Sequence, residues 1–254
     1  MKFISKPTRF IFSIYAFLIF LTWMFILLPF VIVASFFGKE KGGNMIYAIC
    51  RFWANACLLF WGIRHQNRFE APHDATHPCI FVFNHISYMD IPILMTAFRY
   101  QHIRVLGKAE MSKLPIFGYI YKKAVVTVDR SDATHRAVSV STLKAVLRKN
   151  ISVVIAPEGT FNMGDTALKS FYDGAFRIAI DTQTPIKPVL FLDALDRMHY
   201  RSVFSMTPGR SRAIYLAEVP VQGYTIDQTS ALKEKVYQIM EDGLRRYNAV
   251  WIND

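Results

Sequence analysis

The stretch FVFNHISYMD, residues 81–90, begins as an apolar run, passes through a histidine and ends in an aspartate. Residues 81–83 have the composition of a buried strand. On an ideal helix, side chains five residues apart point about 140° away from each other, so His85 is expected in the loop before a helix. Ser87 would then be the N-cap and Asp90 the third helical residue. From there Asp90 can accept from one imidazole nitrogen and leave the other free as a base.

A structural alternative explains part of the same stretch. Ser87 and Asp90 also match a capping box, which stabilises a helix start and requires no histidine. His65 and Glu70 have the same spacing as the first pair, but they lie in a polar connector with no strand before it. The strand context therefore favours the pair of His85 and Asp90 as the functional one.

Downstream of residue 78, short apolar runs alternate with amphipathic segments. Buried strands are expected at 79–83, 103–106, 124–128, 152–156 and 186–192. Helices are expected at 87–98, 114–123, 131–149, 173–182 and near 228–247. This alternation predicts an α/β fold with a mostly parallel or mixed sheet flanked by helices. Pro185 and Pro188 remove ladder donors and predict an edge or a bend in the last strand.

The N-terminal part is strongly apolar. Residues 10–37 contain no charged side chain, which allows one tilted membrane span or a hairpin that bends near Pro29. Basic residues on both sides of this run suit a hairpin with both ends on the cytoplasmic face. Residues 44–63 are expected to form an interfacial helix with Trp53 and Trp61 near the headgroups, a second span, or a buried helix.

We therefore expect two parts. Residues 1–66 would be a membrane-associated helical segment with an apolar helix, and residues 67–254 would be the α/β domain. The net charge of +11 and the 52% of hydrophobic residues favour anionic phospholipid as partner over nucleic acid, because the basic residues are dispersed. The three cysteines, Cys50, Cys57 and Cys79, have neither metal nor disulfide spacing and indicate thiols in a reducing compartment without a metal site.

Several blocks follow one another in a fixed order: NHISYMD (84–90), KAEMSKLPIFG (108–118), VVTVDR (125–130), APEGTFN (156–162) and IKPVLF (186–191). In order and approximate spacing they resemble the motif blocks of the glycerolipid acyltransferase family, typified by lysophosphatidic acid acyltransferase. The resemblance covers about residues 79–217. It implies a membrane enzyme that moves a fatty acyl group from acyl-CoA or acyl carrier protein, as co-substrate, to a lysolipid hydroxyl. It implies no bound cofactor.

The resemblance also implies roles for single residues. His85 would deprotonate the acceptor hydroxyl and Asp90 would orient it, without a covalent acyl-enzyme, which agrees with the lack of a GxSxG motif. Glu158 would hold the glycerol part of the acceptor or brace its loop, and Gly159 would permit a tight turn. The expected substrate-binding residues are Asn84, Ser87, Lys108, Arg130, Glu158, Gly159, Thr160 and Lys169.

One position departs from the family pattern. Phe161 stands where the family usually has an arginine after the threonine, and losing a charged hydrogen bond to phosphate costs on the order of 1.5 to 3 kcal/mol. Either Lys169 compensates or the acceptor carries another head group. The first expectation is 1-acyl-sn-glycerol 3-phosphate, giving phosphatidic acid, and the alternatives are a lyso-aminolipid acceptor or a non-catalytic lipid-binding protein. The expected location is a membrane, with the catalytic domain on its cytoplasmic face, and the inner membrane in a bacterium.

Overall fold

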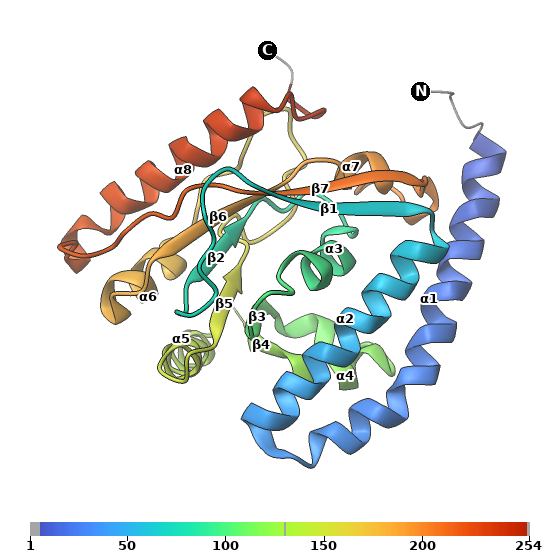
Figure 1. The fold of residues 1–254 in the computed structure, drawn as a ribbon, viewed down its shortest axis with the longest axis horizontal. Coiled ribbons are helices and arrows are strands. Elements are labelled where there is room, and N and C mark those ends of the chain that lie inside the picture. Colours follow the sequence, from blue (N-terminus) through green and yellow to red (C-terminus); the bar gives the residue numbers. More distant parts are fainter. Residues whose placement is uncertain (1–5, 130, 253–254) are drawn as a thin grey trace.

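The computed structural model describes residues 6–129 and 131–252, and its centre is a seven-stranded mixed sheet (Figure 1). The strands are β1 (Ile63–Phe69), β2 (Ile80–Phe83), β3 (Ile103–Lys108), β4 (Val125–Val128), β5 (Ser152–Ile155), β6 (Ile186–Phe191) and β7 (Gly209–Tyr215). Their order across the sheet is β1-β7-β6-β2-β5-β3-β4. The pair of β6 and β7 is antiparallel, and the other pairs are parallel. The predicted α/β class is confirmed.

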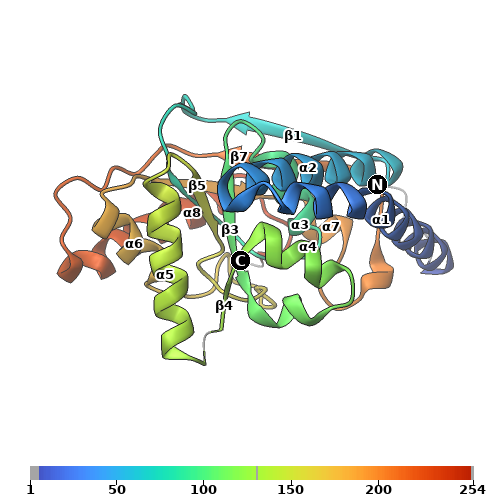
Figure 2. The same cartoon turned by 90° about the horizontal axis from the view of Figure 1, so that it is seen from below.

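Helices cover both faces of the sheet (Figures 1 and 2). One face carries α5 (Ala133–Leu147), α6 (Gly174–Thr182) and α8 (Thr229–Arg246). The other carries α2 (Gly43–Phe60), α3 (Asp90–Ala97) and α4 (Phe117–Ala124). The remaining short segments are α7 (Ala194–Arg197), η1 (Gly38–Gly42), η2 (Ala109–Lys113), η3 (Val203–Ser205) and η4 (Ile226–Gln228).

Strands β2 to β6 are those that the sequence predicted, whereas the inner strand β7 was missed. Every residue of β2, β5 and β6 is buried, because helices cover both faces of these strands, and this explains their largely apolar composition. The edge strand β1 reads IRHQNRF and is half exposed, so it lacks that composition. The prediction of a polar connector over residues 64–78 was therefore wrong for residues 64–69, which belong to β1, and right for the rest. The expected domain boundary between residues 66 and 67 falls inside β1.

Pro188 does not lie on an edge strand, so the edge alternative of that prediction was wrong. β6 is an inner strand between β2 and β7. The pairing of β6 with β7 begins one residue later, at Val189 opposite Tyr215, and the carbonyl of Pro188 accepts from the N–H of Leu216 at 3.0 Å. The missing donor of Pro188 therefore falls at the end of the antiparallel ladder, where little pairing is lost.

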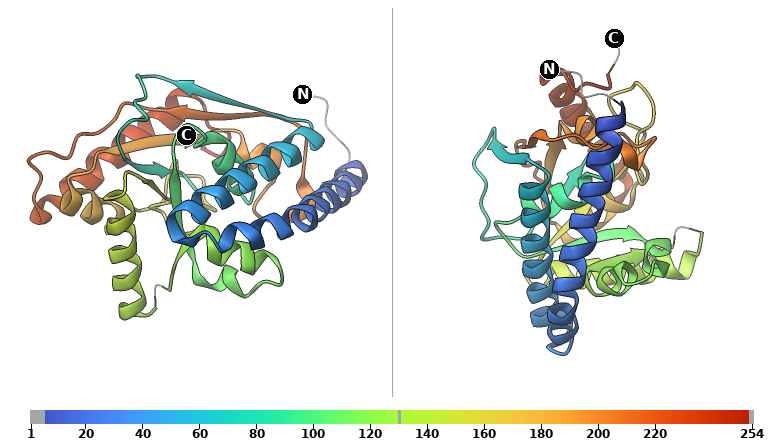
Figure 3. Two further views of the ribbon diagram at one scale, coloured as in Figure 1. Left: turned by 60° about the horizontal axis from the view of Figure 1, so that its bottom comes forward. Right: turned by 90° about the vertical axis from the view of Figure 1, so that its right-hand side faces the viewer.

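The N-terminal part is an antiparallel helical hairpin of α1 (Lys6–Ser35) and α2, as Figure 3 shows. α1 runs unbroken through Pro29, and the chain reverses at residues 36–42, so of the two alternatives the hairpin with a bend near Pro29 was wrong. By length and composition α1 could cross a membrane, and only 17% of its most apolar window is buried. The apolar helix of the sequence analysis thus exists as one continuous element.

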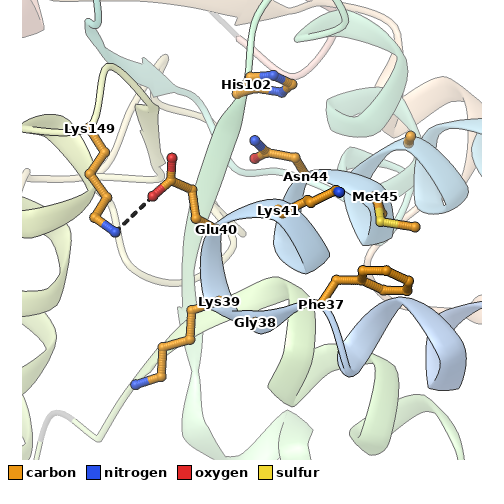
Figure 4. Close-up of a pocket in the computed structure, with 10 residues that line it drawn as sticks. Phe37, Gly38, Lys39, Glu40, Lys41, Asn44, Met45, His102 and Lys149 are labelled. Atoms are coloured by element: carbon orange, nitrogen blue, oxygen red, sulfur yellow. Dashed lines mark hydrogen bonds and ion pairs between the residues drawn. The ribbon is translucent and has the colours of Figure 1, made fainter.

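The turn between α1 and α2 is bonded to β3 and to the segment that precedes β5. The guanidinium of Arg104 in β3 donates to the carbonyl of Glu40 at 3.1 Å, and Lys149 pairs with the Glu40 carboxylate at 2.8 Å (Figure 4). α2 lies between α1 and the α/β domain. Trp61 is 3% exposed and donates from Nε1 to the carbonyl of Ala16 at 3.0 Å, so its ring packs inside the protein.

Candidate active site

The candidate catalytic residues lie at one edge of the sheet. β2, β5, β3 and β4 are neighbours that run in parallel, so their carboxyl ends meet at the same edge. His85 follows β2 there and Glu158 follows β5. This is the edge at which open α/β sheets bind their ligands.

His85 and Asp90 form a hydrogen-bonded pair. The distance from His85 Nδ1 to Asp90 Oδ2 is 2.7 Å, and the same oxygen accepts from the N–H groups of Ile86 at 2.8 Å and Ser87 at 3.0 Å. The Asp90 side chain is 1% exposed, whereas the His85 side chain is 25% exposed. Among the described residues, His85 Nε2 has no hydrogen-bond partner. The geometry therefore leaves Nε2 free to accept a proton from a bound substrate.

The start of α3 differs from the expectation. Asp90 is the first helical residue and Met89 is the cap, so Ser87 is not the N-cap. The Ser87 hydroxyl donates to the carbonyl of Met198 and accepts from the N–H of Met89 at 3.1 Å. These bonds hold residues 87–90 in a turn that leads into α3, so the helix begins later than expected. Asp90 still reaches back to the preceding loop, as predicted.

Glu158 connects two loops of the site. One carboxylate oxygen accepts from the N–H of His85 at 2.8 Å, and the other accepts from the N–H of Lys169 at 2.9 Å. Glu158 is 2% exposed, and burial, as the largest cause, raises its pKa to about 7, against the lowering effect of these two bonds. The nearby Asp90 raises the pKa further. Of the two expected roles, these contacts match the brace of the loop.

The loop after β5 is arranged around Gly159. Its φ of +73° is a left-handed conformation that favours glycine, as expected for a tight turn. Lys169 donates from Nζ to the Thr160 hydroxyl at 2.7 Å. The ammonium group is therefore held beside this loop, where an anionic head group would find a positive charge.

The other four predicted binding residues differ in their contacts and exposure. Asn84 is 2% exposed, donates to the carbonyl of Phe191 at 3.0 Å and accepts from its N–H at 2.8 Å, so it links β2 to β6. Ser87 is likewise buried and bonded to main-chain groups. Lys108 ends β3 and is exposed. Arg130 lies outside the described residues. Substrate contacts of all four residues stay predictions.

Aromatic rings surround the imidazole. The Phe161 ring lies edge to face with the His85 ring, with centroids 4.5 Å apart, and Tyr88 lies edge to face with Phe161 at 4.8 Å. The sequence had marked Phe161 as a departure, but not as a neighbour of His85. Asn162, which was missed, donates its N–H to the carbonyl of His85 at 2.8 Å. No sequence signal marks such a main-chain contact.

The site can now be compared with known proteins. A profile of the acyltransferase family matches residues 62–192, which is more than half of the chain. The chain belongs to the acyltransferase family. Family membership makes the protein an enzyme that transfers an acyl group.

This acyltransferase has named relatives. It is 28% identical to the human 1-acyl-sn-glycerol-3-phosphate acyltransferase beta over 205 residues, which cover 79% of this chain and 73% of the human protein. It is 24% identical to the 1-acyl-sn-glycerol-3-phosphate acyltransferase of Helicobacter pylori, over 86% of this chain and 88% of that protein.

A solved structure shares the fold of this acyltransferase. The 1-acyl-sn-glycerophosphate acyltransferase PlsC of Thermotoga maritima superimposes with a TM-score of 0.73, over 96% of this chain and 100% of the other. The sequence identity is 20%, so the likeness is one of fold. The arrangement of the sheet and the N-terminal hairpin therefore has an experimental counterpart.

Proposed function

We propose that this acyltransferase moves a fatty acyl group from an acyl thioester to the free hydroxyl of a lysolipid. The acceptor that we favour is 1-acyl-sn-glycerol 3-phosphate, and the product is then phosphatidic acid. The names of the relatives support this acceptor. The observation that carries the proposal is the 2.7 Å bond between His85 Nδ1 and Asp90 Oδ2, on a ring whose Nε2 remains open.

The proposed reaction needs one base and no covalent enzyme intermediate. Asp90 accepts the Nδ1–H bond and thereby leaves a lone pair on Nε2 of His85. Nε2 takes the proton of the acceptor hydroxyl while the hydroxyl oxygen attacks the thioester carbonyl carbon. The carbon–sulfur bond then breaks, and the leaving thiolate takes the proton from the imidazolium. A free thiol and an ester are formed, and the base is regenerated.

The loop after β5 is proposed to hold the acceptor. Glu158 fixes this loop relative to His85 through two main-chain bonds, and Lys169 supplies a positive charge to the head group. Lys108 and Arg130 are proposed as further contacts to the phosphate. The proposal includes no metal and no resident cofactor, and either acyl-CoA or acyl carrier protein as the donor.

We further propose that α1 and α2 hold the enzyme at a membrane, where its lysolipid acceptor is dissolved. The length and the apolar composition of α1 support this location. The catalytic domain is proposed to face the cytoplasm, because both soluble donors occur there. Protease protection of the α/β domain in sealed membrane vesicles of known orientation tests this sidedness.

The activity is tested with the purified full chain in detergent. We expect release of free thiol from acyl-CoA or acyl carrier protein and formation of phosphatidic acid, detected by mass spectrometry. Exchange of Lys169 for methionine removes the ammonium but keeps the chain length. This variant should lose about tenfold in kcat/KM for lysophosphatidate, as expected for a charged hydrogen bond. Absence of phosphatidic acid with both donors would overturn the choice of acceptor.

A second acceptor class is favoured by Phe161. Its ring, with its centroid 4.5 Å from that of His85, places an apolar wall beside the base, at the position where the family usually has an arginine. A lyso-aminolipid with an amide or carboxylate head group is therefore the alternative. A competition assay with equal amounts of both lysolipids decides between them. Preference for the aminolipid, together with an unchanged rate of the Lys169→Met variant, would replace the first proposal.

A further inference from the structure

The chain between α7 and β7 connects the apolar helix α1 to the catalytic loops. We call residues 198–206 the bridging segment. At one end the ring of Phe204 packs on the ring of Phe10 in α1, with centroids 5.0 Å apart. The N–H of Met206 donates to the hydroxyl of Ser13, also in α1, at 3.0 Å. This end of the bridging segment is therefore fastened to α1.

The other end of the bridging segment contacts the candidate active site. The hydroxyl of Ser87 donates to the carbonyl of Met198. The hydroxyl of Tyr200 donates to the carbonyl of Met163 at 2.9 Å. Ser87 lies two residues after His85, and Met163 lies two residues after Phe161. The bridging segment thus touches both loops whose side chains meet at the imidazole.

Apolar side chains are exposed along the whole connection. The exposed fractions are 48% for Phe10, 51% for Phe204, 52% for Val203, 63% for Met163 and 44% for Tyr88. Phe10 and Phe204 are in contact while each remains half exposed, so the segment and α1 share an outer surface. Large exposed apolar patches on a protein mark a surface that binds a partner or a membrane.

The neighbours of this surface fit a lipid bilayer. It continues an apolar helix that is long enough to cross a membrane and is mostly uncovered by protein. Arg201 is exposed, and its guanidinium lies 5.7 Å from the centre of the Tyr200 ring. An arginine beside aromatic and apolar side chains is the composition of a membrane interface, because the cation reaches the headgroups while the rings enter the lipid.

We propose that the bridging segment is part of the membrane-binding surface, inserts Val203 and Phe204 into the lipid interface, and thereby keeps His85 and Phe161 at headgroup level. The lysolipid acceptor then reaches the base without leaving the bilayer. The acceptor part of this statement rests on the proposed function. The insertion of the segment does not depend on it.

A fluorescent label tests the insertion directly. Val203→Cys in the full chain, labelled with an environment-sensitive fluorophore, is reconstituted into vesicles of phosphatidylcholine and phosphatidylglycerol. The matched control is Val138→Cys, because Val138 is 58% exposed on α5, on the opposite face of the sheet (Figure 2). Native protein treated with the same fluorophore gives the background signal from Cys50, Cys57 and Cys79, which are at least half-buried. We expect quenching of the label at 203, but not at 138, by brominated lipid. Quenching of both labels only by iodide in the water phase would overturn the proposal.

The functional consequence is tested with two forms of the acceptor. The variant Val203→Asp/Phe204→Asp should lose about tenfold in turnover of long-chain lysophosphatidate embedded in vesicles, since two apolar side chains no longer enter the lipid. Its turnover of short-chain lysophosphatidate, dissolved as monomers, should stay native. Val138→Asp should leave both rates native.

The turnover assay distinguishes a failure of this proposal from a failure of the proposed function. Equal losses on both forms of the acceptor, or native turnover of both, would overturn the role of the bridging segment. If the native enzyme turns over neither form, the proposed acceptor is wrong. The fluorescence experiment then still decides whether residues 203 and 204 enter the bilayer.

Discussion

Two histidines in this chain are followed five residues later by a carboxylate, and only one of the two pairs meets. His85 bonds Asp90 at 2.7 Å. His65 lies in β1, where its ring nitrogens contact Ser211 and Asn67, while Glu70 bonds Arg246 at 2.7 Å. In a strand, five residues extend over about 17 Å and odd spacings point to opposite faces. A spacing of five residues therefore does not by itself bring the two side chains together. His85 and Asp90 meet because a turn precedes a helix at this place.

The largest expected effect separates the two histidines. His85→Ala should lower kcat by about 10² to 10⁴-fold, because the variant has no general base. His65→Ala should keep a kcat close to that of the native enzyme, since both nitrogens of His65 are occupied by structural contacts. Initial rates at saturating donor and acceptor measure both values. A similar loss in the two variants would abolish the distinction between the pairs.

The next effect separates the two carboxylates. Asp90→Asn should lower kcat by roughly tenfold to a hundredfold, because a neutral amide holds the imidazole less firmly and bonds to charged groups contribute about 1.5 to 3 kcal/mol. Glu70→Gln should change kcat little, since it weakens only an ion pair near the surface. The ratio of the two kcat values is the measurement. A fully active Asp90→Asn enzyme would remove Asp90 from the catalytic pair.

A third prediction concerns the brace of the His85 loop. Burial raises the pKa of Glu158 from 4.5 to about 7, so the folded state binds more protons than the unfolded state between these values. The stabilising contribution is therefore present at low pH and is lost as the pH rises toward 7, by up to about 3 kcal/mol. Thermal unfolding in detergent across this pH range measures it.

The matched variant for this prediction is Glu158→Gln, which has no titrating group at this position. Its unfolding temperature should change less between pH 4.5 and pH 7 than that of the native protein. Identical pH dependence of the two proteins would show that Glu158 does not titrate in this window. The bonds to the N–H groups of His85 and Lys169 would then hold an ionised carboxylate throughout.

The two kinds of strand show how far the sequence predicts this fold. The inner strands β2, β5 and β6 are covered on both faces, and burial favours the mostly apolar runs by which they were found. The edge strand β1, which contains several exposed polar residues, and its inner neighbour β7, whose first half reads GRSR, were missed. Their pairing is parallel and joins residues far apart in the chain, such as Ile63 and Gly209. A local pattern carries no signal for such a contact.

For the site, the local pattern was enough to predict the strand, the loop that carries His85, and an aspartate placed to reach back to it. These features depend on contacts within a few residues, where side-chain type and spacing decide the geometry. The bond from the N–H of His85 to Glu158, and the Phe161 ring with its centroid 4.5 Å from that of His85, became visible only in the folded chain. Those contacts exist because the parallel pairing of β2 with β5 brings two distant loops to the same edge of the sheet.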